Sequence, residues 1–299
     1  MSPSRGGSWL VTGAAGQLGS ALVARLAERG LPCEPRDSRL DVSDAAAVRR
    51  ELVALKPAVL ANAAAYTDVD GCERDPARAK ATNAEAPAAL AAACRELGIR
   101  LLHVSTDYVF DGRASRPLAE DAEVAPLSEY GRSKLLGERA VLAASASFVV
   151  VRTSWVFGRG RNFIASVYAR ARQVRSDPSK GPLRVVDDQL GSPTYAEDLA
   201  GGLVELVERG ASGLYHLANR GAASRYALAR YALDAAGFAD LEIQPVKTLD
   251  FPLPAPRPLY TVLDCTRAAR LGVALRPWQE AVSAYLAADF SPARTASGS

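Results

Sequence analysis

The fold is decided by one stretch near the N-terminus, SWLVTGAAGQLGSALVARL, at residues 8–26. The apolar run 8–12 predicts a buried strand, and the leucines that follow the glycines recur at helical spacing over 17–29. Glycine suits a turn of positive φ, a backbone close to a pyrophosphate, and tight packing of helix on strand. The free amides that begin such a helix favour phosphate. The stretch therefore predicts a dinucleotide site made by five residues: Gly13, Gly16, Gln17, Leu18 and Gly19. The alternative is a tight connection with no ligand.

Strand and helix patterns alternate along the first half of the chain. Strands are expected over 8–12, 58–62, 99–105 and 148–152, and helices over 17–29, over 44–55 after a Ser43 cap, from Pro76, and again from Pro87 to Leu97. This alternation is typical of parallel β-α-β units with right-handed crossovers. We therefore expect an α/β fold with a Rossmann-type doubly wound parallel sheet, whose ligands bind beyond the carboxyl ends of the strands.

The second half is less regular and contains a proline-rich segment over 251–258. We expect residues 8–152 to form the dinucleotide-binding domain, with one return of the chain near 196–218 through a strand at 213–217. Residues 153–195 and 219–290, including a helix over 224–236, are expected to form a smaller α+β substrate domain. Residues 1–7 and 291–299 are expected to be flexible tails.

Composition excludes several classes of protein. The 299 residues are 48% hydrophobic, which argues against wholesale disorder, and 36 basic against 33 acidic residues give no concentrated charge for nucleic acid. No apolar run reaches the about 18 residues of a membrane helix, and the N-terminus does not match a secretory signal. The four cysteines are widely spaced, which predicts reduced thiols, no metal site and a cytoplasmic location.

A further strand is expected to end near Arg36, between the strands at 8–12 and 58–62, and the segment after it bears on the choice of cofactor. An acidic residue there favours a free ribose 2′-hydroxyl, and an arginine favours a 2′-phosphate. The chain has Arg36, Asp37 and Arg39, from which we predict NADPH, with NADH as the alternative. Asp41 and Val42 are placed to meet the adenine, although Asp41 also suits a plain helix entry.

A tyrosine and a lysine four residues apart form the second chemical motif. On a helix, Tyr130 and Lys134 share one face, and a nearby ammonium is expected to lower the tyrosine pKa from its ordinary value of about 10. Thr106 ends a predicted strand upstream and can hydrogen-bond a reacting carbonyl. Together these residues predict a proton-transfer site next to the dinucleotide.

With these motifs in place, the sequence resembles the extended short-chain dehydrogenases/reductases and, more closely, the dTDP-4-dehydrorhamnose reductase family. The G-x-x-G-x-x-G spacing and Tyr130–Lys134 mark the superfamily. The reductase branch is indicated by the strings at residues 62–70, 105–112, 152–157, 188–194 and 213–217, together with Arg257-Pro258. Thr106 is followed by Asp107-Tyr108 instead of the Asp-Glu pair of sugar 4,6-dehydratases, so the machinery for eliminating water is missing.

The resemblance implies NADPH-dependent reduction of the C4 ketone of a dTDP-6-deoxy-4-ketohexose, either dTDP-4-dehydrorhamnose or a related antibiotic sugar such as a dihydrostreptose precursor. It implies a catalytic trio of Thr106, Tyr130 and Lys134. The cofactor would pass three small residues: Ala63, Ala64 and Ala65. The substrate would be bound by Thr106, Asp107, Tyr108, Trp155, Gln189, Thr194 and Arg257. Arg161 and Arg257 are candidates to neutralise a diphosphate, and a homodimer is the candidate assembly.

Two alternatives use the same scaffold. A nucleotide-sugar epimerase would keep and recycle its cofactor. A non-catalytic, NADP-binding regulatory subunit would bind the cofactor without turnover, although the intact trio argues against it.

Overall fold

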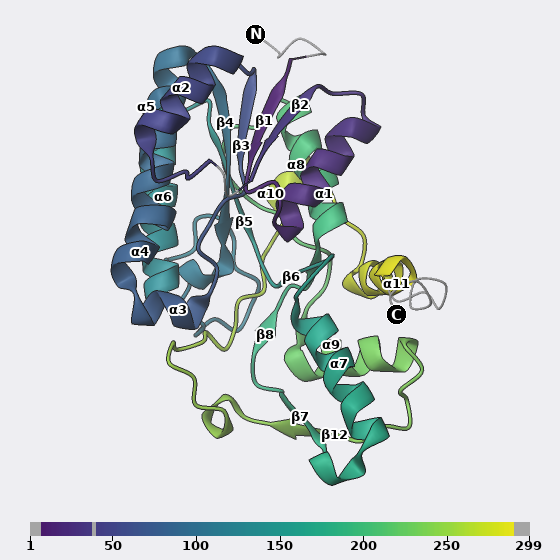
Figure 1. The fold of residues 1–299 in the computed structure, drawn as a ribbon. Helices are drawn as coiled ribbons and strands as arrows, with labels where there is room; N and C mark the ends of the chain where they lie inside the picture. Colours follow the sequence, from purple (N-terminus) through teal and green to yellow (C-terminus); the bar gives the residue numbers. More distant parts are fainter. Residues whose placement is uncertain (1–6, 38–39, 290–299) are drawn as a thin grey trace.

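The computed structural model describes residues 7–37 and 40–289. Nearly all of the two predicted tails, and Arg39, therefore lie outside the described residues. At the centre is a six-stranded parallel sheet in the order β10-β5-β4-β3-β1-β2 (Figure 1). Its strands are β1 (Trp9–Thr12), β2 (Cys33–Arg36), β3 (Val59–Asn62), β4 (Arg100–Thr106), β5 (Val149–Thr153) and β10 (Gly213–His216). The predicted doubly wound α/β fold is confirmed.

Helices cover both faces of this sheet (Figure 1). One face carries α1 (Gln17–Glu28), α8 (Ala196–Glu208) and α10 (Thr266–Arg270), and the other carries α2 (Ala45–Leu55), α5 (Ala86–Leu97) and α6 (Glu129–Ala144). Successive strand side chains point to opposite faces, so Val149 and Val151 join the first hydrophobic core and Val150 joins the second. A strand buried on both faces needs the continuous apolar runs seen in the sequence.

Two helix starts differ from the prediction. Asp44, not Ser43, caps α2: its carboxylate accepts hydrogen bonds from the amides of Ala46 and Ala47 at 3.0 and 2.9 Å. Pro87 does not restart a helix. It lies within a continuous helical run made of α4 (Pro76–Lys80), the π-turn η1 (Ala81–Glu85) and α5, preceded by α3 (Val69–Arg74). Pro87 is the second residue of α5 and follows directly after the π-turn η1.

The second half of the chain forms a smaller lobe below the sheet in Figure 1. Its helices are α7 (Phe163–Ser176), α9 (Arg225–Ala235) and α11 (Trp278–Asp289). Its strands pair as β6 (Val156–Phe157) with β9 (Thr194–Tyr195), β8 (Leu190–Gly191) with β11 (Ala223–Ser224), and β7 (Leu183–Val186) with β12 (Ile243–Val246). Two short 3₁₀ turns, η3 (Pro178–Lys180) and η4 (Thr248–Asp250), also belong to it, whereas the 3₁₀ turn η2 (Asp107–Val109) directly follows β4 of the large sheet.

The chain comes back to the large sheet twice, not once. The first return is α8 and β10, which pairs with β5. The second is α10 and the residues after it, because Ala268, Val273 and Leu275 are buried in the same core as Val149. The expectation of a single return missed this because α10 is too short to give a clear helical period. None of the helices within the described ranges has the length and apolar character needed to cross a membrane.

Candidate active site

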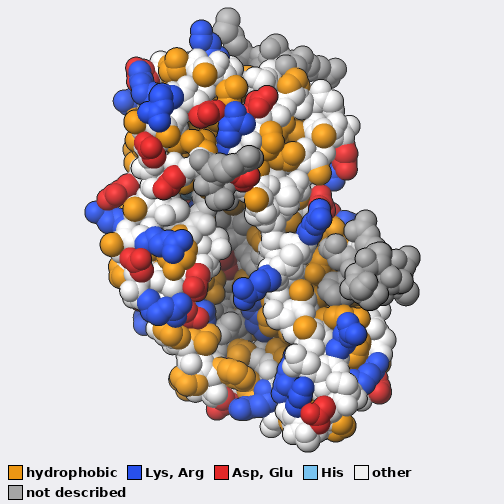
Figure 2. All heavy atoms as spheres, viewed as in Figure 1, with side chains coloured by type: hydrophobic (Ala, Val, Ile, Leu, Met, Phe, Trp, Pro, Cys, Tyr) orange, Lys and Arg blue, Asp and Glu red, His pale blue; other side chains and the backbone are white. Residues whose placement is uncertain are grey.

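A groove of about 970 Å³ runs along the carboxyl ends of β1, β3, β4 and β5. Figure 2 shows this face hollowed between the two lobes, with Lys and Arg side chains on the rim. Most of the predicted site residues line it: Gly13, Gly16, Gln17, Leu18, Gly19, Asp41, Val42, Ala63, Ala64, Ala65, Thr106, Asp107, Tyr108, Tyr130, Lys134 and Trp155. The parallel sheet explains this convergence, since all of its strands deliver their following loops to the same edge.

Four predicted residues do not line the groove. Arg36 turns its guanidinium to Glu51, at 3.1 and 3.0 Å. Gln189 donates to the Thr248 hydroxyl at 3.1 Å, and Thr194 is fully buried, with its hydroxyl on the carbonyl of Ser192. The fourth, Arg257, forms a two-pronged ion pair with Asp70, at 2.9 Å for each prong. Sequence motifs located these residues in the chain but not the partners that hold their side chains.

The glycine turn leaves no room for side chains. Gly13 has φ +69°, and a Cβ there would lie 2.7 Å from the amide nitrogen of Ala64. A Cβ on Gly19 would lie 2.0 Å from the carbonyl oxygen of Gly13. The first residue of α1 follows Gly16, which offers no side-chain cap. The amides at this helix start are thus open to a ligand, and the turn fits the pyrophosphate of a dinucleotide.

Polar side chains, Asp41 and Ser43, line the edge of the groove on the β2 side. The Asp41 carboxylate accepts hydrogen bonds from the Ser43 hydroxyl at 2.7 Å and from its amide at 2.9 Å, and these bonds lower the pKa of Asp41. Across the groove, Gln17 donates to the carbonyl of Arg161 at 2.6 Å, which ties the start of α1 to the small lobe. Arg161 also lines the groove. This end suits an adenosine and its phosphates.

The proposed trio meets in the middle of the groove. Thr106 ends β4, and Tyr130 and Lys134 lie one turn apart on α6, only 9% and 2% exposed. The Lys134 ammonium donates to the carbonyl of Val104 at 2.6 Å. Gly131 lets α6 approach, because a Cβ there would lie 2.2 Å from the carbonyl oxygen of Tyr108. The sequence Tyr-Gly therefore brings the phenol close to the end of β4.

The expected effect of the lysine on the tyrosine was wrong. Burial raises the pKa of Tyr130 above its ordinary value, and the hydrogen bond with Thr106 opposes this only in part. Burial also lowers the pKa of Lys134 to about 8, although the negative charge of Glu138 opposes the change. In a site of low polarity, burial disfavours the charged form of each group. Tyr130 is therefore protonated at neutral pH, which is the state that a proton donor requires.

An aromatic wall closes the side of the groove next to the trio. The rings of Tyr108 and Tyr130 meet edge to face at 5.5 Å. Trp155 has φ +47°, and its ring lies so close to Gly191 that a Cβ there would be 2.4 Å from it. A left-handed conformation is costly for a residue with a side chain and persists only when its surroundings fix it. Trp155 is thus held rigidly beside the reacting groups.

A buried carboxyl lies beneath this wall. Asp107 accepts hydrogen bonds from the hydroxyls of Ser154, at 2.7 Å, and Thr106, at 3.0 Å. Burial raises the pKa of Asp107, while its bonds from Thr261, Ser154 and Thr106 oppose this. The carboxyl fixes the side chains around it and is not open to solvent.

Among the groove residues that were not predicted from the sequence, two carry polar groups next to the trio and the aromatic wall. The guanidinium of Arg225, at the start of α9, lies 3.6 Å from the centre of the Trp155 ring and hydrogen-bonds the Tyr108 hydroxyl. The buried hydroxyl of Thr153 lines the groove and has no hydrogen-bond partner within the described part of the chain. No motif marks Arg225, because it follows a loop of another lobe and reaches the site only through the fold.

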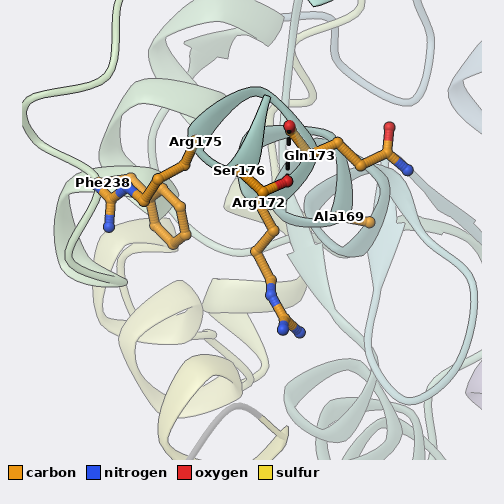
Figure 3. A pocket seen from close by; sticks show the side chains of 6 residues that line it. All are labelled: Ala169, Arg172, Gln173, Arg175, Ser176 and Phe238. Carbon is orange, nitrogen blue, oxygen red and sulfur yellow. Dashed lines mark hydrogen bonds between the residues drawn. The ribbon is translucent and has the colours of Figure 1, made fainter. Parts of the chain in front are cut away.

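Another hollow, on the surface of α7, does not resemble a reaction site. Figure 3 shows its six lining side chains: Ala169, Arg172, Gln173, Arg175, Ser176 and Phe238. Arg175 stacks 3.9 Å from the centre of the Phe238 ring and pairs with Asp240 at 2.5 Å. The lining holds no acid–base pair. Over the described ranges there is also no cluster of three His, Cys, Asp or Glu side chains that could hold a metal ion.

Comparisons with known proteins show the family and agree with the overall fold. A family model described as RmlD substrate binding domain matches residues 8–290. The dTDP-4-dehydrorhamnose reductase of Mycobacterium tuberculosis is 43% identical over 288 residues, which cover 93% of this chain and 92% of that protein. A probable dTDP-4,6-dihydroxy-2-methyloxan-3-one 4-ketoreductase of Streptomyces antibioticus is 41% identical over 295 residues, covering 96% and 98%. The crystal structure of the Bacillus anthracis dTDP-4-dehydrorhamnose reductase in complex with NADP superposes with a TM-score of 0.87 at 30% identity, covering 94% of this chain and 99% of that one.

Proposed function

Since the chain belongs to the dTDP-4-dehydrorhamnose reductase family, we propose that it reduces the C4 ketone of a dTDP-4-keto-6-deoxyhexose with NADPH. The observation that carries the proposal is the meeting of Thr106, Tyr130 and Lys134 beside the glycine turn in one groove. The volume of about 970 Å³ is at the upper end of the range for ligand pockets, which suits two ligands end to end.

The residues of the groove divide the work. Bound NADPH supplies the hydride. Tyr130, which is protonated at neutral pH, gives its proton to the oxygen of the former ketone. The Thr106 hydroxyl, which bonds the tyrosine, orients the carbonyl by turning its proton from Asp107 to the ketone oxygen when the substrate binds. The Lys134 ammonium, one turn along the same helix face, stabilises the phenolate that Tyr130 becomes.

The remaining side chains hold the sugar and the cofactor. Trp155 and Tyr108 form the wall against which the hexose packs, and Asp107 holds that wall through Thr106 and Ser154. The turn 13–19 and Ala63–Ala65 would hold the cofactor, since larger side chains at these positions would fill the groove.

NADPH is proposed over NADH because the Bacillus anthracis relative is known in complex with NADP. Arg36 does not support the choice, since it is paired with Glu51. The ratio of kcat/KM for the two cofactors tests it. A ratio that favours NADH would contradict the NADPH assignment and leave the reduction itself standing.

The activity is tested by mixing the purified chain with NADPH and enzymatically generated dTDP-4-keto-6-deoxy-L-sugar. A reductase consumes NADPH in step with the sugar, whereas an epimerase gives no net loss. A regulatory subunit gives no loss but still binds NADPH. Tyr130→Phe is expected to lower turnover by about 10²- to 10⁴-fold and to leave NADPH affinity nearly unchanged. Full turnover by this variant would contradict the assignment of the proton donor.

The sugar, the compartment and the assembly complete the proposal. The substrate is either dTDP-4-dehydrorhamnose or a related antibiotic deoxysugar, which a panel of ketosugars separates. All four cysteines are free, which supports a reducing cytoplasm. The homodimer stays a prediction that sedimentation equilibrium of the full chain tests.

A further inference from the structure

Arg225 is a groove cation that the proposed chemistry does not use. It lies between the Trp155 ring, at 3.6 Å, and the Phe163 ring, at 5.0 Å, and it hydrogen-bonds Tyr108. Across residues 7–37 and 40–289, no carboxylate forms an ion pair with it. A guanidinium that is partly removed from water without an anion is costly, so the site favours an anionic ligand.

The nearest acid does not fill that role. Asp107 influences Arg225 through its charge, but its oxygens are taken up by the hydroxyls of Thr106 and Ser154. Thr261 also hydrogen-bonds this carboxyl. Arg225 lines the groove, so the guanidinium donors that Tyr108 does not use are available to a ligand there.

The other cations near the groove have different places. Arg257, the sequence candidate for the diphosphate, is paired at both ends of its guanidinium with Asp70. Arg78 lies over the Tyr66 ring at 4.3 Å, and Arg161 is tied to the start of α1 through Gln17. Arg225 is the groove arginine that adjoins the wall of Trp155 and Tyr108, next to Tyr130.

We propose that Arg225 binds the diphosphate of the sugar nucleotide, at the phosphate next to the hexose. This inference rests on the proposed function. The ketone at C4 must meet Tyr130, and the carbon that carries the phosphate lies at the opposite end of the hexose ring. Tyr108 links the two sites: its ring lies 5.5 Å from that of Tyr130, and its hydroxyl is hydrogen-bonded by Arg225.

The stacking on Trp155 prepares the guanidinium for this role. It fixes the plane of the guanidinium before the ligand arrives, so little side-chain entropy is lost on binding. Two parallel hydrogen bonds from a fixed guanidinium match two phosphate oxygens, whereas a lysine offers only a point charge.

The test is equilibrium binding of dTDP and of thymidine to the NADPH-loaded protein by calorimetry. We expect Arg225→Gln to weaken dTDP binding by about 10- to 100-fold and to leave thymidine binding and NADPH affinity unchanged. Arg225→Lys is expected to recover only part of the loss. Arg172→Gln, which removes an arginine of the same lobe outside the groove, is the matched control and should change nothing.

The outcomes separate the two proposals. Wild-type protein that neither binds dTDP nor consumes NADPH with the ketosugar would refute the proposed function. Wild-type protein that does both, with dTDP binding unchanged in Arg225→Gln, would overturn only the inference. A larger loss in Arg257→Gln than in Arg225→Gln would assign the phosphate to Arg257. An effect of Arg225→Gln on the KM for the ketosugar without an effect on dTDP would assign Arg225 to the hexose instead.

Discussion

Replacement of Glu138 by Gln tests how the helix that carries the proposed proton donor is held. Glu138 and Arg152 are 2% and 3% exposed and form a two-pronged pair at 2.9 and 2.5 Å. Glu138 also accepts a hydrogen bond from Ser105 at 2.9 Å. The variant leaves the Arg152 charge buried without its counter-charge, for which the expected loss is about 3–5 kcal/mol in the free energy of unfolding.

The matched control is a pair of the same shape on the surface. Arg49 and Glu96 also form two hydrogen bonds, at 2.5 and 2.7 Å, but their side chains are 47% and 59% exposed. Solvent screens exposed pairs, so Glu96→Gln should leave stability unchanged within the error of the measurement. The hydrogen bonds of the Arg49–Glu96 and Arg152–Glu138 pairs have similar lengths, so the two pairs differ mainly in how far their side chains are buried.

The assay is urea unfolding followed by circular dichroism, carried through a double-mutant cycle with Arg152→Met. The double variant should lose less free energy of unfolding than the sum of the two single variants. With both the carboxylate and the guanidinium removed, no buried charge is left without its partner. A loss below about 1 kcal/mol in Glu138→Gln, or additive losses in the cycle, would refute the reasoning that an unpaired buried charge sets the cost.

Two further predictions concern the cofactor and the pH profile. Gly19→Ala is expected to lower NADPH affinity by at least about tenfold, because its Cβ would lie 2.0 Å from the Gly13 carbonyl oxygen. Gly201→Ala is the control, since a Cβ there makes only ordinary contacts. Fluorescence titration of NADPH measures the affinity of both variants. The kcat/KM for the ketosugar should fall as pH rises through about 8, because Lys134 then loses the proton that makes it a cation. Glu138→Gln should move the midpoint of this fall to lower pH, since Glu138 raises the pKa of Lys134. A profile flat to pH 10, or a midpoint that rises in Glu138→Gln, would contradict the role given to the ammonium.

Local patterns were sufficient to predict the frame of this protein. The alternating apolar runs predict the six-stranded parallel sheet, and glycine spacing locates the turn over α1, since both depend on residues close in sequence. The trio could be predicted for the same reason: Thr106 ends a strand, and Tyr130 and Lys134 share a helix face. What these predictions used was periodicity and the rule that parallel strands end at one edge.

Side-chain partners could not be predicted in this way. Arg257 was expected to face the nucleotide, but Asp70, far away in the sequence, takes both prongs of its guanidinium. Arg225 carries no motif, yet the fold places it on Trp155. The choice of partner for a long, flexible cation depends on which carboxylate the fold brings within reach, and neither periodicity nor spacing contains that information.

The burial that suits α6 to proton transfer also affects stability. Lys134 has a pKa of about 8 in the folded chain, below its ordinary value of 10.5, so folding disfavours its charge by roughly 3 kcal/mol at neutral pH. Between pH 8 and 10.5 the unfolded chain binds more protons at this residue, so its contribution to stability improves as pH rises. The proposed activity, for which Lys134 must carry its proton, is expected to decline over the same window. Tyr130, Lys134 and Glu138 follow one another at intervals of four residues along α6, so the pair of Glu138 with Arg152 supports the helix and also keeps the neighbouring ammonium charged. We infer that the fold accepts a buried cation at Lys134 because the reaction requires its charge, and that Glu138 limits the cost.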